Sequence, residues 1–257
     1  AGMNPKETED IMELIKNFGM NISKITEERK LKPLKELPLS VEELCDRYEK
    51  LTTCIVSDVL REEALLDQAL PRILPIKHNM KVAGIAFTVK GSKNVMIEEG
   101  IQEFRAEIWR NIHENSVVVI DTGGANEDDN ISIMGGVTAR TIKQRGCKGA
   151  VVDGGSRDTY ETLALNFPIF CKYRSPNALM GRWKFTHYQV LIKIGNVFIR
   201  PGDIVFGDID GVIIIPRDIA YKVLVRAEEI VRIERKLIKW VDEGLDTSEI
   251  VKRGGYF

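Results

Sequence analysis

Residues 117–121, VVVID, and residues 149–158, GAVVDGGSRD, decide the fold of this 257-residue chain. Each begins with a short apolar run, the pattern of a strand that is buried on both faces. Between them, residues 135–145 have the pattern of a helix, and Gly146 stands where the glycine after a helix end is expected. Two buried strands joined by a helix predict a parallel β-α-β crossover, and therefore an α/β fold.

Further elements are predicted on both sides of this crossover. Ser40 and Glu43 have the spacing of a capping box, so a helix is expected from Ser40, with another over residues 53–66. A strand at residues 85–89 is followed by a helix whose apolar face would be Ile97, Ile101, Phe104, Ile108 and Ile112. Later strands are expected at 190–194, 197–200, 204–207 and 212–215, separated by turns, and then a long helix from 218 to about 241.

This pattern divides the chain into three parts. Residues 1–39 are interpreted as a helical N-terminal arm, with apolar positions at Ile11, Leu14, Ile15 and Phe18 and a cloning remnant at residues 1–3. Residues 40–216 form a single compact α/β domain. Residues 217–257 form a C-terminal helical extension, and a helix of this length often packs against another subunit.

The composition favours a small-molecule or subunit partner. Lys plus Arg total 37 against 38 for Asp plus Glu, so no net field attracts nucleic acid or an anionic membrane. Four cysteines without paired spacing indicate a reducing compartment, and no apolar run is long enough for a membrane span. We therefore expect a cytoplasmic protein.

Two loops follow the neighbouring strands of the crossover region and carry candidate site residues. The first contains Gly135, Gly136, Val137 and Thr138, whose free N–H groups at a helix start suit a carboxylate or phosphate. The second contains Arg157 and Asp158. A guanidinium binds an oxyanion, and a carboxylate is a hard ligand for Mg²⁺ or Mn²⁺. Because such loops lie at one edge of the sheet, they predict one site for a metal-chelating 2-oxo acid.

Simpler interpretations exist for each of these residues. Asp158, three residues before Glu161, has the spacing of a helix cap; Arg157 would then be a solvated surface residue, and the glycines would only shape turns. The acidic run at 127–129 is typical of a solvated turn, and His78, His113 and His187 lack zinc-site spacing.

The ordered motifs resemble those of the RraA-like proteins and the class II 4-hydroxy-4-methyl-2-oxoglutarate aldolases, over about residues 50–216. The resemblance is carried by residues 135–139, GGVTA, and 149–158, GAVVDGGSRD. Further matches are 57–60, SDVL; 84–89, GIAFTV; 200–203, RPGD; and 207–212, GDIDGV.

The resemblance implies a swivelling β/β/α domain, a homotrimer or hexamer with sites between subunits, and lyase activity. The acid that matches Asp158 holds Mg²⁺ or Mn²⁺, and the arginine that matches Arg157 contacts the 2-oxo group. The amides that match Val137 and Thr138 hold the pyruvate carboxylate. Carbon–carbon cleavage would pass through a pyruvate enolate, an intermediate that oxaloacetate decarboxylation shares.

One position departs from the aldolases, which carry an acid where this chain has Gly136. The proton-transfer group is therefore open, with a metal-bound water, an acid of another subunit, or support from Asp121 or Asp153 as alternatives. A second class of function also stays open, because the RraA regulators of ribonuclease E resemble the same sequence and bind a protein partner. The Arg157-Asp158 pair favours the lyase. No glycine-rich nucleoside loop supports a methyltransferase.

Overall fold

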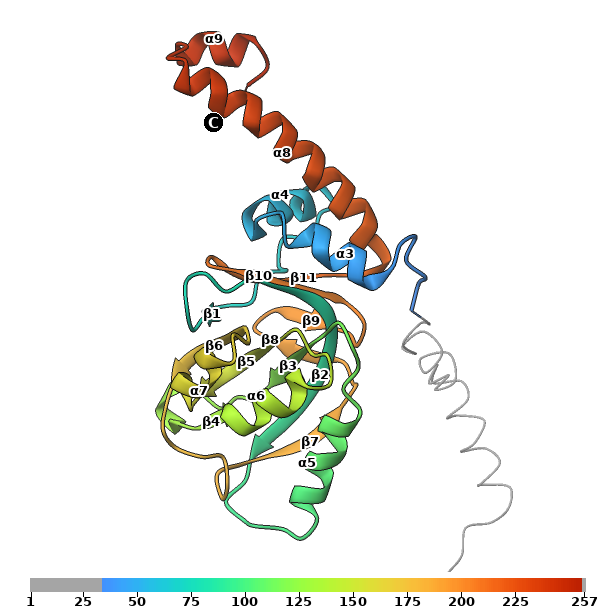
Figure 1. Ribbon diagram of the computed structural model, residues 1–257, viewed down its shortest axis with the longest axis vertical. Helices are drawn as coiled ribbons and strands as arrows, with labels where there is room; N and C mark the ends of the chain where they lie inside the picture. Colours follow the sequence, from blue (N-terminus) through green and yellow to red (C-terminus); the bar gives the residue numbers. More distant parts are fainter. Residues whose placement is uncertain (1–33, 256–257) are drawn as a thin grey trace, which may run out of the picture. The chain divides into compact units, whose positions relative to one another are not determined.

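The computed structural model describes residues 34–255, and the predicted helical stretch at 11–18 lies outside that range. One mixed sheet has the strand order β1-β6-β5-β3-β2-β10-β11, with β4 paired to β5 and β7 paired to β2, and β8 and β9 form a separate hairpin. Figure 1 shows the arrangement. The strands are β1 (Leu74–Pro75), β2 (Val82–Lys93), β3 (Ser116–Asp121), β4 (Ser132–Met134), β5 (Gly149–Ser156), β6 (Ile169–Arg174), β7 (Trp183–Tyr188), β8 (Ile192–Ile194), β9 (Val197–Ile199), β10 (Ile204–Asp208) and β11 (Gly211–Ile215).

The predicted crossover is confirmed. Strands β3 and β5 pair in parallel, with Val117 opposite Gly149 and Ile120 opposite Val152, and every residue of both strands is buried. The helix between them is α6 (Gly136–Lys143), and Gly146 after it has a φ of +81°. Such a φ favours glycine, so the residue ends the helix as the sequence predicts.

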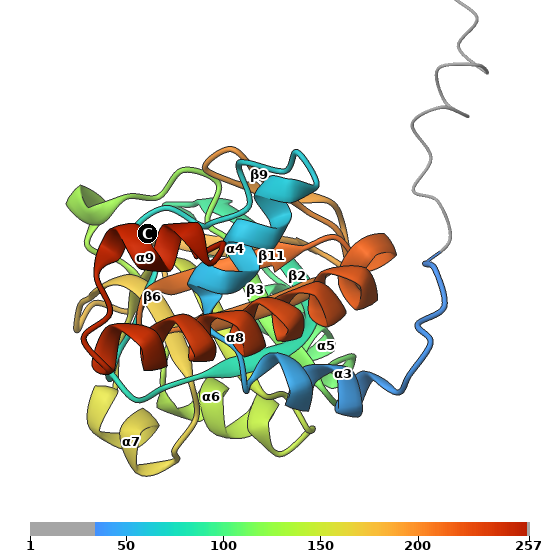
Figure 2. The same cartoon turned by 90° about the horizontal axis from the view of Figure 1, so that it is seen from above.

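Helices cover the sheet in two groups (Figures 1 and 2). Helices α5 (Ile101–Arg110) and α6 supply Ile108, Trp109 and Ile142 to an apolar core against the parallel strands. A second core joins β10 and β11 to α3, α4 and α8, and the β8–β9 hairpin covers a third. The remaining helical elements are α3 (Val41–Tyr48), α4 (Thr53–Glu62), η1 (Glu127–Asp129), α7 (Thr159–Ala164), η2 (Arg217–Ile219), α8 (Ala220–Asp242) and α9 (Thr247–Lys252).

Most predicted element bounds hold within two or three residues, with two corrections. Helix α4 ends at Glu62 rather than at 66, because Ala64 adopts a left-handed backbone with a φ of +59°. Ile97 does not belong to the apolar helix face: it precedes α5, and 73% of its surface is exposed. The hydrophobic spacing predicts a helix that starts one turn too early. The helix in the structure begins at Ile101, directly after Gly100, whose φ of +79° is not helical.

The long C-terminal helix is confirmed as α8 and is anchored at its beginning. The fully buried Tyr48 of α3 donates its hydroxyl to the carbonyl of Ala220 at 2.7 Å. About two turns further along α8, Glu228 makes a bidentate ion pair with Arg47 of α3, with N–O distances of 2.8 and 2.7 Å. The predicted cap of α3 is also present, because Ser40 accepts a hydrogen bond from the Glu43 N–H. No helix in the described range 34–255 is long and apolar enough to cross a membrane.

The start of α4 is tied to the β10–β11 turn by one buried carboxylate. Asp208 accepts hydrogen bonds from the Thr53 N–H and the Thr53 hydroxyl, at 2.8 and 2.7 Å, and from the Asp210 N–H at 3.0 Å. This carboxylate therefore caps α4 from a distant strand and fixes the turn that follows β10.

We expect Asp208→Ala to lower the free energy of unfolding by about 2–4 kcal/mol, because the buried N–H and hydroxyl groups of Thr53 lose a charged acceptor. Urea unfolding measures the loss. Asp210→Ala is the matched control, because among residues 34–255 its exposed carboxylate accepts one hydrogen bond, from the Cys54 thiol at 3.5 Å. Equal losses in the two variants would contradict the role assigned to Asp208.

Candidate functional site

The two predicted site loops lie side by side because β4 pairs with the end of β5. Ser132 is opposite Gly155, Met134 is opposite Ser156, and the Arg157 N–H donates to the Met134 carbonyl at 2.9 Å. The residues that follow these strands, Gly135 in one loop and Arg157 in the other, are thereby held together. The prediction that both loops reach one place is confirmed.

Asp158 joins the loops with its side chain. Its Oδ2 atom accepts a hydrogen bond from the Gly136 N–H at 2.9 Å, so it caps α6 and not its own helix. Asp158 occupies the position before α7 but makes no side-chain bond to that helix. Its φ of +57° and ψ of +41° are left-handed, a conformation that Asp tolerates better than most residues. The hypothesis that Asp158 caps α7 is therefore wrong.

The two glycines of the first loop lie close to acidic side chains. Gly135 has an extended backbone, with φ −143° and ψ 175°, that any residue can adopt. A Cβ at Gly135 would lie 2.7 Å from Asp158 Oδ2, and one at Gly136 would lie 3.1 Å from Glu161 Oε2. Gly135 therefore leaves room for the Asp158 carboxylate in addition to any part in the turn, and a side chain at Gly136 would require a small shift of Glu161.

A cavity of about 140 Å³ opens beside these loops. Five of its lining residues are predicted site residues: Gly135, Val137 and Thr138 at the start of α6, and Arg157 and Asp158. The N–H groups of a helix's first turn have no partner within the helix, so those of Val137 and Thr138 suit an anion. The Gly136 N–H is already used by Asp158. The full lining is Arg105, Ser132, Ile133, Met134, Gly135, Val137, Thr138, Arg157, Asp158, Ala178, Leu179 and Met180.

Arg157 is partly exposed and borders the cavity, so it is more than a solvated surface residue. Its Nε atom lies 3.5 Å from Asp158 Oδ2, a long contact that leaves much of the guanidinium free. The other oxygen of Asp158, Oδ1, makes no hydrogen bond or ion pair with any residue in the range 34–255. One face of the cavity thus offers both a cationic fork and a free carboxylate oxygen.

Sequence reasoning missed three contributors to the site. Arg105 of α5 lines the cavity and donates to the Thr138 hydroxyl at 2.8 Å. Glu161 of α7 places its carboxylate against Gly136. Leu179 and Met180 form an apolar wall. The spacing of Glu161 from Asp158 could have indicated that Glu161 belongs to the site, although it also fits a helix cap. No local sequence feature distinguishes Arg105 from other arginines on helix surfaces.

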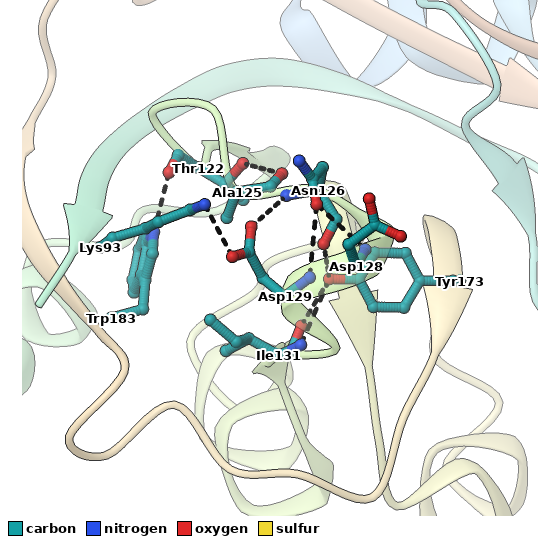
Figure 3. A network of polar contacts seen from close by, with 9 residues as sticks. All are labelled: Lys93, Thr122, Ala125, Asn126, Asp128, Asp129, Ile131, Tyr173 and Trp183. Atoms are coloured by element: carbon teal, nitrogen blue, oxygen red, sulfur yellow. Dashed lines mark hydrogen bonds and ion pairs between the residues drawn. The ribbon is translucent and has the colours of Figure 1, made fainter. Parts of the chain in front are cut away.

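The segment that leads into β4 is fixed by polar contacts, which Figure 3 shows. Asn126 and Asp129 form a capping box around η1, and the Asp129 carboxylate lies 2.6 Å from the Lys93 ammonium of β2. The Trp183 indole donates to the Thr122 carbonyl at 2.9 Å, and the Tyr173 hydroxyl lies 3.0 Å from the Asn126 carbonyl. The acidic run at 127–129 is therefore a turn that a capping box and an ion pair hold in place.

Asp121 and Asp153 do not reach the cavity. Each follows a residue of the helix-side core, Ile120 or Val152, so both side chains project from the opposite face of the sheet. Asp121 lies 3.5 Å from Lys90, and Asp153 lies 2.5 Å from the Lys172 ammonium. Burial raises the pKa of Asp153 above its usual value, and Lys172 opposes that shift. Neither acid can exchange a proton directly with a ligand in this cavity.

Between residues 34 and 255, no group of three or more His, Cys, Asp or Glu side chains could hold a metal ion. Asp158 and Glu161 are the carboxylates that lie against the two glycines. One or two carboxylates, completed by water and substrate, suit Mg²⁺, which keeps several waters when it binds to proteins. The residues present therefore fit a hydrated divalent cation and not a site formed by protein ligands alone.

The fold and the cavity define an α/β protein with an anion-binding helix start beside an Arg-Asp pair. The chain belongs to the RraA-like family, described as Aldolase/RraA, whose profile matches residues 53–214.

Relatives of this chain have three kinds of description. A protein of Halalkalibacterium halodurans, named "Putative 4-hydroxy-4-methyl-2-oxoglutarate aldolase", is 35% identical over 180 residues, which cover 69% of this chain and 78% of the relative. A crystal structure described under "novel cellulases from microbes associated with the gut ecosystem" is 46% identical, with a TM-score of 0.79, and covers 86% of this chain and 99% of its own. Streptomyces coelicolor RraAS2, from "the RNase ES inhibitor RraA protein family", shares the fold at 24% identity, with a TM-score of 0.68 over 78% of this chain and 97% of its own.

Proposed function

We propose that this protein is a divalent-metal-dependent lyase that cleaves a small 2-oxo acid through a pyruvate enolate. The observation that carries the proposal is the meeting of the α6 start, Arg157 and Asp158 around one cavity. Free helix N–H groups, a guanidinium and a carboxylate oxygen are the groups needed to bind a carboxylate, an oxo group and a cation, respectively. The relative from Halalkalibacterium halodurans is named as a putative aldolase, and aldolase chemistry is consistent with these groups.

Each residue has a proposed task in this reaction. The Val137 and Thr138 N–H groups bind the carboxylate of the 2-oxo acid, and Arg157 binds the 2-oxo oxygen, which becomes more negative as the enolate forms. Asp158 Oδ1 would hold Mg²⁺ or Mn²⁺. The bound cation would supply Lewis-acid polarisation of the 2-oxo group. The hydrogen bond from the Gly136 N–H fixes the Asp158 carboxylate from its other side.

Glu161 is the proposed proton-transfer residue. The aldolases have an acid at the position of Gly136, and the Glu161 carboxylate lies 3.1 Å from where a Cβ of that residue would stand. The two arrangements place an acid in the same part of the site. Glu161 would accept the 4-hydroxyl proton while the C3–C4 bond breaks, and the enolate would then gain a proton at C3 to give pyruvate. Oxaloacetate decarboxylation would use the same enolate.

The ribonuclease-inhibitor function of relatives such as RraAS2 is the competing proposal, because it needs the fold but no catalytic site. Retention of Arg157 and Asp158 at the cavity, with Glu161 against Gly136, favours the lyase. We also propose that the catalytic site belongs to residues 40–216, with residues 1–39 as an N-terminal arm and residues 217–257 as a C-terminal extension whose helix α8 packs on that domain. The proposed assembly is a homotrimer or hexamer, and the proposed ligands are 2-oxo acids rather than nucleic acid or membrane.

We expect Asp158→Asn to lower metal-dependent activity by about 100-fold or more, because an amide is a poor ligand for a hard cation. The amide oxygen can still accept from the Gly136 N–H, so the melting temperature without metal should change by less than about 2 °C. Asp128→Asn, in the exposed turn, is the control. Wild-type activity and metal response in Asp158→Asn would refute the assignment.

With Mg²⁺ or Mn²⁺ present, the enzyme should exchange the methyl protons of pyruvate with deuterium from the solvent, because exchange requires enolisation. Arg157→Lys should slow exchange by about 100-fold, since an ammonium keeps the charge and loses the planar fork. Proton NMR of the pyruvate methyl signal in D₂O measures the rate.

The matched comparison for exchange is Glu161→Gln, which should slow it while leaving Mg²⁺ affinity nearly unchanged. Absence of exchange above the metal-only control, for either metal, would favour the binding-protein function over the lyase.

We expect light scattering at micromolar concentration to give the mass of a trimer or hexamer. The apolar side chains of Ile238 and Val241 on α8 are 57% and 51% exposed. Apolar surface of this kind is often covered by another subunit. A measured mass equal to that of a monomer would contradict the proposed assembly. It would also contradict the expectation that sites lie between subunits.

A further inference from the structure

The second half of α8 has an apolar face that the described part of the chain leaves largely uncovered. Up to Ile230 this face packs with α3 and α4. Beyond Ile230 the helix extends past those two helices, and α9 folds against its far end (Figure 1). The side chains of Ile233, Ile238 and Val241 are 45%, 57% and 51% exposed, although they continue the helical spacing of the buried positions. Residues 231–241 are called the distal segment of α8 below.

Helix α9 covers one flank of the distal segment. The guanidinium carbon of Arg253, directly after α9, lies 5.7 Å from the centre of the Trp240 ring, and Ile250 of α9 is buried. Ile238 projects about 160° around the helix from Trp240, because each residue turns the helix by about 100°. The flank that contains Ile238 therefore stays open to a partner.

The distal segment is also strongly basic. It has four cations against one acid, Glu234. The cations are all exposed and project within about 100° of one another around the helix; they are Arg232, Arg235, Lys236 and Lys239. A helix with an open apolar face beside a row of cations fits an amphipathic segment of negative charge.

This chain contains such a segment near its beginning. Residues 7–18, ETEDIMELIKNF, have four acids and one lysine, the inverse of the distal segment. Their apolar positions are spaced as on one face of a helix and are Ile11, Leu14, Ile15 and Phe18. Residues 7–18 lie outside the range 34–255, so their charge and spacing come from the sequence. Both segments also lie outside the family profile, which covers residues 53–214.

The described chain begins beside the start of α8. The Lys35 carbonyl accepts a hydrogen bond from Arg217 Nε at 2.8 Å, and the Lys35 ammonium donates to the Asp218 carbonyl at 3.4 Å. Residues 19–34 can span about 50 Å when fully extended. That reach exceeds the roughly 35 Å length of α8, so it is long enough for residues 7–18 to reach a neighbouring subunit.

We propose that residues 7–18 of one subunit dock on the distal segment of α8 in a neighbouring subunit. The two extensions outside the family domain would thereby join subunits to one another. Apolar side chains of residues 7–18 cover Ile238 and Val241, and their negative charge faces the cations of α8. The inference goes beyond the lyase chemistry and rests only on the proposed homo-oligomer.

A charge-reversal cycle tests this contact in the full chain. Asp10→Lys/Glu13→Lys and Arg235→Glu/Lys239→Glu should each raise the concentration at which the oligomer dissociates by about tenfold or more, because like charges then face each other. All four substitutions together should restore most of the loss. Light scattering over a dilution series measures dissociation. Because Arg235 and Lys239 are exposed, their reversal should leave the fold intact.

Two controls accompany the cycle. Glu42→Lys/Asp67→Lys reverses two exposed acids away from the distal segment and should change dissociation by less than about threefold, since isolated surface charges contribute little. Ile238→Asp should promote dissociation as the charge reversals do, whereas Leu66→Asp, at a residue 75% exposed in the loop after α4, should not.

A disulfide identifies the subunit that supplies residues 7–18. Cys54→Ser first removes the exposed native thiol. In that background, oxidised Leu14→Cys/Ile238→Cys should give covalent dimers and larger species on a non-reducing denaturing gel. Each single variant alone controls for thiols that pair with their own kind. A cross-linked product that stays monomeric would place residues 7–18 on their own subunit and overturn the proposal.

The remaining outcomes separate this docking from the other proposals. If the wild type is a trimer or hexamer and neither reversal changes its dissociation, the assembly stands and the docking is wrong. A monomeric wild type contradicts both. If Arg235→Glu/Lys239→Glu abolishes binding to phosphatidylserine vesicles and leaves the mass unchanged, the distal segment binds an anionic membrane and the proposal is wrong. Deuterium exchange into pyruvate tests the lyase separately, and its absence would not change the result expected from the cycle.

Discussion

The hydrogen bond from the Gly136 N–H to Asp158 Oδ2 is the interaction on which the site depends. It connects the loop after β4 to the loop after β5, and it turns a carboxylate that would otherwise cap α7 towards the start of α6. The bond also uses one helix N–H and leaves the next two free. Two weak sequence features, a glycine pair and an Arg-Asp pair, are brought side by side by the pairing of β4 with β5, and this contact joins them into one site.

The fold could be predicted from sequence because its signals are local. Continuous apolar runs identified β3 and β5, and a glycine after charged residues identified the end of α6. The site could be predicted in part for the same reason, since Val137, Thr138, Arg157 and Asp158 lie in loops next to those strands. What could not be predicted depends on distant contacts. The side-chain direction of Asp158 follows from a left-handed backbone, and Arg105 reaches the cavity from a helix 33 positions before Thr138.

Charge is distributed unevenly around the cavity, and this shapes what it can hold. The Asp158 carboxylate lines the cavity beside the cations Arg157 and Arg105, and the Glu161 carboxylate lies against Gly136. Asp121 and Asp153 are each balanced by a lysine on the other face of the sheet, so they add little to the field in the cavity. The arrangement suits a ligand that carries both negative charge and oxygens able to chelate a cation.

The left-handed backbone of Asp158 has an evolutionary consequence. Few residues adopt such a conformation at low cost, and glycine adopts it most readily. An aspartate codon becomes a glycine codon by a single base change, and that change would delete the carboxylate without straining the chain. The position of the proposed metal ligand is therefore one whose backbone conformation a glycine adopts without strain. A fold built in this way can give rise to non-catalytic binding proteins by one mutation, and its enzymes must be distinguished from them by this residue, since overall shape is common to both.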